Sequence, residues 1–82
     1  MKIRLYTTLG CHLCEEALFM LHQLQERGIL LSVEEIEIAD SDVMINRFGI
    51  RVPVIVREDD KELDWPFSIY EVEKFLSAQS AL

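Results

Sequence analysis

The spacing of apolar residues in this 82-residue chain changes near residue 10, and that change restricts the possible folds strongly. Apolar and polar residues alternate in residues 2–7, which predicts a strand with one buried face. In residues 12–27 the apolar residues recur every three or four positions, as in a helix packed on one side, and Gly28 is suited to end it. Phe19 lies off this stripe, so it either covers a flank of the core or belongs to a contact surface. With a strand to follow, the pattern predicts a right-handed β-α-β unit with parallel strands.

A second strand and a short helix are expected in the middle of the chain. The strand lies within residues 30–38, with an irregular start or a bulge, because Val33 is out of phase with Ile36 and Ile38. The stretch ADSD offers several N-caps for a helix over VMINRF, and Gly49 ends that helix.

Two strands and a helix complete the pattern. The run VPVIVR and the segment ELD are separated by the polar turn EDDK, so they should pair as antiparallel strands. Ser68 and Glu71 have the spacing of a capping box at the start of the last helix. The order β-α-β-α-β-β-α predicts an α/β, thioredoxin-like fold. We expect a four-stranded mixed sheet flanked by three helices, in a single domain of residues 1–82.

Acidic residues outnumber basic ones by 15 to 8, which gives a formal net charge of −7. This balance argues against a nucleic-acid-binding protein, because binding to phosphates needs clustered basic residues. No apolar run approaches the ~18 residues of a membrane-spanning helix, and the chain does not begin with the pattern of a secretory signal. We therefore expect a cytoplasmic monomer that binds neither nucleic acid nor membranes.

Both cysteines of the chain lie where the spacing changes, as Cys11-His-Leu-Cys14. Cys11 falls at the N-terminus of the predicted helix, and Cys14 falls on its apolar stripe. One thiol should therefore be accessible and the other covered, which is the asymmetry that a thiol–disulfide couple needs. The dipole of the helix favours a thiolate at Cys11, whereas Glu15 and Glu16 in the first turn oppose it.

Two other interpretations of the cysteines stay open at this point. The spacing also suits half of a zinc site, but His12 and His22 cannot easily complete it within one chain, so a dimer would be needed. Alternatively, both cysteines are small buried residues. A covalent haem site is excluded, because Glu15 stands where a histidine would be required. The strand–turn–helix context favours the redox interpretation.

Over essentially its whole length, the chain resembles the glutaredoxins of the thioredoxin superfamily, especially the small bacterial glutaredoxin-like proteins. The resemblance lies in LYTTLGCHLCEEA, in RVPVIV and in a capped final helix after ELDWPF. It implies that Cys11 is the nucleophile and Cys14 the resolving thiol. It also implies that Pro53, after Val52, is cis and lies against the cysteines, so that a substrate chain could pair with the Val52 backbone.

The chain departs from the glutaredoxin pattern where glutathione would bind. The lysine that often precedes the cysteines is missing from the segment TLG, and His12 replaces the usual proline. Asp64 and Trp65 stand in place of the glycine pair that cradles glutathione. Trp65 either covers the site, stacks on a peptide partner or packs against the final helix. Arg47 and Arg51 either meet the glycyl carboxylate of glutathione or are simply exposed to solvent.

We therefore predict a small thiol–disulfide oxidoreductase that reduces protein disulfides or glutathione mixed disulfides through Cys11 and Cys14. No bound cofactor or metal is expected, and glutathione is a candidate co-substrate. The expected substrate-binding residues are His12, Leu13, Arg51, Val52, Pro53, Asp64 and Trp65. The alternatives are a binding module with little turnover, which would dock a partner peptide, and a zinc site shared between two chains.

Overall fold

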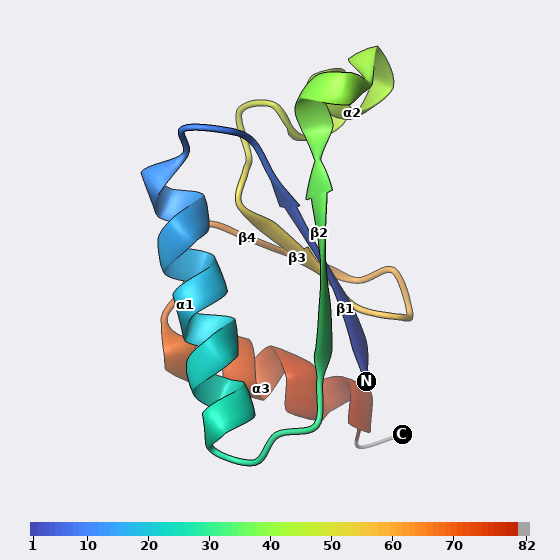
Figure 1. Ribbon diagram of the computed structural model, residues 1–82. Coiled ribbons are helices and arrows are strands. Elements are labelled where there is room, and N and C mark those ends of the chain that lie inside the picture. Colours follow the sequence, from blue (N-terminus) through green and yellow to red (C-terminus); the bar gives the residue numbers. More distant parts are fainter. Residues whose placement is uncertain (81–82) are drawn as a thin grey trace.

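The computed structural model describes residues 1–80 and has the predicted order of strands and helices (Figure 1). Its helices are α1 (His12–Glu26), α2 (Asp42–Phe48) and α3 (Ile69–Ser80). Its strands are β1 (Lys2–Thr7), β2 (Ser32–Glu37), β3 (Val54–Val56) and β4 (Glu62–Asp64). A short 3-10 helix, Ile38–Asp40, joins β2 to α2 and was not expected from the sequence. Among the described residues, no helix is long and apolar enough to cross a membrane.

The four strands form one mixed sheet in the order β2-β1-β3-β4. As predicted, β1 and β2 are parallel, whereas β3 and β4 are antiparallel. The prediction of an irregular start or a bulge near Val33 is wrong, because β1 and β2 pair residue by residue from Lys2–Ser32 to Thr7–Glu37. Alternation along a regular strand puts Glu35 and Glu37 on the face of Val33. The apolar pattern is interrupted there because this end of the face borders a cavity, described below, instead of the core.

The core consists of one apolar cluster on each face of the sheet. On one face, Ile3, Leu5 and Ile55 pack under α1 and α3, which lie next to each other in Figure 1. On the other face, Tyr6 stacks on Phe48 with the ring centroids 4.2 Å apart, beside the short helix α2. Because α1 is held firmly along the sheet, its N-terminus and the cysteines there have a defined position.

Two helix ends match their sequence signals. Gly28, after α1, has a φ of +95°, a left-handed conformation that glycine adopts without strain. At the start of α3, the Glu71 N–H donates to Ser68 Oγ at 3.1 Å, and the Ser68 N–H donates to Glu71 Oε1 at 3.0 Å. The predicted capping box is therefore confirmed.

Candidate active site

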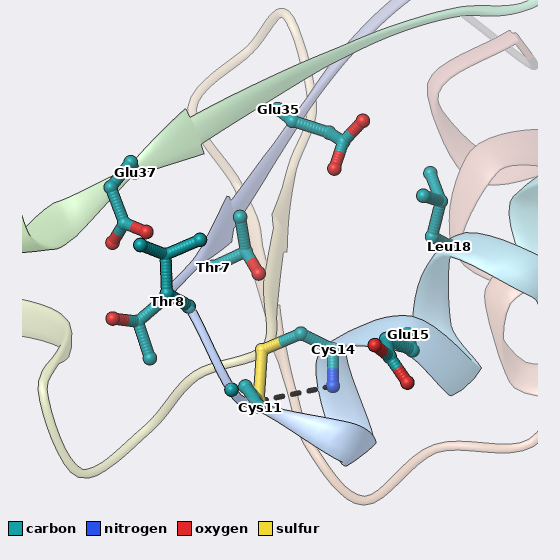
Figure 2. A pocket seen from close by; sticks show the side chains of 10 residues that line it. Thr7, Thr8, Cys11, Cys14, Glu15, Leu18, Glu35 and Glu37 are labelled. Carbon is teal, nitrogen blue, oxygen red and sulfur yellow. Dashed lines mark hydrogen bonds between the residues drawn. A yellow bond between two sulfur atoms is a disulfide. The ribbon is translucent and has the colours of Figure 1, made fainter.

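The two cysteines form a disulfide at the N-terminus of α1 (Figure 2). Cys11 is the N-cap residue, and its sulfur accepts a hydrogen bond from the Cys14 N–H at 3.1 Å. Cys11 is half-buried, whereas Cys14 is only 4% exposed and faces the core. The predicted difference in exposure between the two thiols is confirmed. Within residues 1–80, no group of three or more His, Cys, Asp or Glu side chains is placed to hold a metal ion.

A tight turn between β1 and α1 places Cys11 at the helix start. The Cys11 N–H donates to the Thr8 carbonyl at 3.3 Å, and Gly10 has a φ of +76°, which favours glycine. The Glu37 carboxylate, at the end of β2, accepts the Ala39 N–H at 3.0 Å. That hydrogen bond, with the nearby polar groups of Thr8 and Leu9, lowers the pKa of Glu37. Glu37 therefore lies next to the turn that carries Cys11, with which it lines a common cavity.

A cavity of about 320 Å³ lies beside the disulfide and is lined by both cysteines, Glu35, Glu37 and Leu18, among others. Figure 2 shows the two glutamates on β2 and Leu18 on α1 around this cavity. Neither glutamate is predicted from the sequence to lie near the cysteines. The interrupted apolar pattern after Val33 is the one signal for them in the sequence, and it marks a strand face that borders a cavity and not a bulge.

The segment before β3 contains Val52 and Pro53, and the peptide bond between them is cis. Pro53 is fully buried, and its carbonyl accepts the Trp65 N–H at 3.2 Å. The Trp65–Pro66 bond is also cis, which the sequence did not predict. Residues 52–53 and 64–66 therefore lie together at one end of the β3–β4 pair, although they are more than ten positions apart in the chain.

The two arginines near this segment are paired with carboxylates. Arg51 contacts Asp64 through two hydrogen bonds, of 3.0 and 2.7 Å, and also pairs with Glu62. Arg47 pairs with the same Glu62 at 2.6 Å. Arg51 lowers the pKa of Glu62. A substrate carboxylate would have to displace one of these partners to bind Arg51.

The remaining predicted residues lie at the rim of the site and beside the core. The His12 side chain is 95% exposed, with Nδ1 3.7 Å from Glu15 Oε2, and Leu13 is also exposed.

Trp65 is half-buried against the main core cluster and meets the Phe67 ring edge-on, with the centroids 5.0 Å apart. Of the three arrangements expected for Trp65, this contact matches packing near the final helix.

Comparisons with known proteins agree with this fold. The family model described as Glutaredoxin-like domain (DUF836) matches residues 2–77. The X-ray structure of Northeast Structural Genomics target protein XcR50 from X. campestris is 32% identical, with a TM-score of 0.83 over 93% of this chain and 96% of that one. The solution structure of the same target gives a TM-score of 0.81 over 95% of each chain, also at 32% identity.

A more distant likeness shows the fold alone. Thioredoxin 1 from Thermosipho africanus TCF52B is 21% identical and superposes with a TM-score of 0.66, over 98% of this chain and 99% of the thioredoxin. The predicted thioredoxin-like fold is therefore confirmed. No curated protein matches the sequence.

Proposed function

Because this chain belongs to the glutaredoxin-like domain family (DUF836), we propose that it is a thiol–disulfide oxidoreductase. Cys11 is the attacking thiol and Cys14 the resolving thiol. The observation that carries the proposal is the pairing of an accessible Cys11 at a helix N-terminus with a buried Cys14, at disulfide distance. Accessibility suits the sulfur that meets the substrate, and burial suits the sulfur that reacts only within the protein.

Exchange proceeds in two steps that start from the reduced protein. The Cys11 thiolate attacks one sulfur of a substrate disulfide, and the other substrate sulfur leaves as a thiolate that takes a proton from solvent. Cys14 then gives up its proton to solvent and attacks Cys11 Sγ, which releases the first substrate sulfur as a second thiolate. Two electrons pass from the protein dithiol to the substrate. Two glutathione molecules, or a dithiol reductase, return these electrons by the reverse exchange.

The N-terminus of α1 supports the first step. Unpaired N–H groups and the helix dipole stabilise negative charge there. The Cys14 N–H already points at Cys11 Sγ, 3.1 Å away, and this hydrogen bond would be stronger to a thiolate than to a neutral sulfur. Cys11 is therefore the sulfur that carries the charge in the reduced protein.

The substrate is a protein disulfide in this proposal, with the Val52 backbone and Pro53 as the surface against which its chain pairs. Arg51 is engaged by Asp64 and Glu62, so it offers no free guanidinium to the glycyl carboxylate of glutathione. This pairing supports protein disulfides over glutathione mixed disulfides as substrates. Free thiols of this kind are kept reduced in the cytoplasm, where we place the protein.

A redox titration tests the proposal. The purified protein is equilibrated in glutathione buffers of graded potential, the free thiols are alkylated, and the intact mass is recorded. We expect one reversible two-electron transition between dithiol and disulfide. In Cys14→Ser, the exchange should stop at a mixed disulfide on Cys11, and Cys11→Ser should abolish exchange. Thiols that never pair across the range of potentials, or equal activity in Cys11→Ser, would contradict the proposal and leave a binding module.

A further inference from the structure

A groove of about 660 Å³ runs between α1 and the start of α3 and shares only Glu15 with the lining of the cavity beside the disulfide. Its apolar lining includes Phe19 and Met20 from α1 and Ile69 from α3. Phe19 is 62% exposed, while Met20 and Ile69 are half-buried against the core. The groove therefore offers an apolar floor that solvent reaches, including a large aromatic ring that the core does not use.

The rim of this groove is acidic. Glu15 and Glu16 line it, and the described lining contains no lysine or arginine. Glu15 has only the exposed His12 as a partner, 3.7 Å away, and Glu16 has no ion pair within residues 1–80. The chain as a whole has a net charge of −7, which reinforces the negative potential. Such a groove attracts a cationic ligand, whereas it repels glutathione, in which two carboxylates outweigh one amine.

The groove reaches the first turn of α1, the helix whose N-cap is the reacting Cys11. His12, which lines it, directly follows Cys11, and Glu15 lines both the groove and the cavity beside the cysteines. Figure 2 shows Glu15 next to Cys14. The lining continues along α1 as far as Gln23, which at 1.5 Å per residue is a length of about 16 Å. An extended peptide covers that distance with about five residues, at roughly 3.3 Å each.

We propose that this groove binds the segment of a substrate polypeptide that adjoins its reactive cysteine. The segment carries lysine or arginine, which pairs with Glu15 and Glu16, and a large apolar side chain, which packs on Phe19. The substrates are thus disulfides flanked by basic, apolar sequence. This inference rests on the proposed function, since it names the substrate class for the same cysteine pair.

Two synthetic peptides test the preference. Each holds one cysteine as a mixed disulfide with the same chromophoric thiol, between flanks of leucine with either arginine or glutamate. The rate constant kcat/KM is measured for both peptides at low and at high salt. Uncatalysed reduction by a neutral dithiol corrects for the intrinsic reactivity of each peptide. We expect the arginine peptide to react about three- to tenfold faster at low salt, with the ratio falling towards one as salt rises.

Variants test whether the groove causes the preference for the arginine peptide. In Glu15→Gln/Glu16→Gln, the ratio of kcat/KM for the arginine peptide to that for the glutamate peptide should fall towards one. Because both peptides are measured with the same variant, any change in the reactivity of Cys11 cancels in this ratio. The control Glu26→Gln/Glu34→Gln removes the same charge outside the groove from two exposed carboxylates and should keep the ratio. Phe19→Ala should slow the arginine peptide, whereas Leu30→Ala, at another exposed apolar residue, should not.

The outcomes separate this inference from the proposed function. Equal rates for the two peptides in the wild-type protein would overturn the groove as a binding site, while the exchange itself would stand. An equal loss of preference in the control would overturn it too, because the effect would then be one of net charge. A protein that exchanges with neither peptide and gives no two-electron transition would instead refute the oxidoreductase proposal.

Discussion

At the scale of single residues, Glu37 connects the sheet to the turn in front of the cysteines. Its carboxylate accepts the Ala39 N–H at 3.0 Å and lies within hydrogen-bonding reach of the Thr8 hydroxyl. These donors stabilise the ionised form, so the pKa of Glu37 in the folded protein lies below its ordinary value. Glu37 therefore lies next to Thr8, although about thirty residues separate the two in the sequence.

Replacing Glu37 by glutamine should lower the free energy of unfolding at neutral pH. A carboxylate whose pKa is lowered by folding contributes stability that is present above its unfolded pKa, about 4.5, and is lost as the pH falls through the folded value. The difference between wild type and Glu37→Gln should therefore shrink as the pH drops from about 5 to 3. Urea unfolding measured across this range checks the expectation.

Glu34→Gln is the matched control for that experiment. Glu34 is exposed on the same strand, and its carboxylate makes no hydrogen bond or ion pair within residues 1–80. Its replacement should leave the pH dependence of stability unchanged. A difference between wild type and Glu37→Gln that stayed constant through acid pH would show that the charge of Glu37 does not matter.

At the scale of elements, the start of α3 depends on its capping box. Ser68 and Glu71 satisfy each other's backbone N–H groups at the beginning of this 12-residue helix. The helix then packs Val72 and Leu76 into the core beside α1. The same helix start forms one side of the acidic groove, so the cap influences both stability and the shape of that surface.

Ser68→Ala should lower the free energy of unfolding by about 1 kcal/mol, because the Glu71 N–H loses its acceptor. Ser77→Ala changes an exposed serine near the other end of the helix and should change stability by less than about 0.5 kcal/mol. Thermal or urea unfolding of the two variants at neutral pH provides the comparison. Equal free energies of unfolding for Ser68→Ala and Ser77→Ala would mean that the capping box does not stabilise the folded protein.

At the scale of the whole molecule, Arg57 joins the β3–β4 hairpin to α3. Its guanidinium forms a paired contact with Asp59 and donates to the Phe75 carbonyl at 2.7 Å, while stacking over the Phe75 ring at 4.7 Å. Arg57 is only 7% exposed. A buried cation of this kind is stable only with its partners in place, so it holds the hairpin and the helix in one relative position.

Arg57→Ala should destabilise the protein by about 2–3 kcal/mol, because it removes charge-assisted hydrogen bonds and packing across two elements. Arg27→Ala is the control, since the Arg27 side chain is 55% exposed and its guanidinium is 3.8 Å from Glu73, where an ion pair contributes little. Urea unfolding should separate the two variants clearly. Equal losses of stability would show that burial does not strengthen the Arg57 contacts.

Much of the candidate site follows from local sequence. The exposure of Cys11 and the burial of Cys14 depend on where the helix begins and which face it buries, and both are visible in the apolar periodicity. The strands and the capping box likewise depend on residues close together in the chain. These properties are predictable because backbone geometry repeats over a few residues, and a short stretch is enough to reveal it.

The order of elements, the fold class and the asymmetry of the cysteine pair are all predictable from the amino-acid sequence. The partners of distant residues depend on how the chain packs in three dimensions: the regular pairing of β2, the position of Glu35 and Glu37 beside the cysteines, and the engagement of Arg51 by Asp64 and Glu62. These contacts join segments at least eleven residues apart. The physical reason is that a side chain's charge and size allow many partners, and the packing of the sheet and helices selects one.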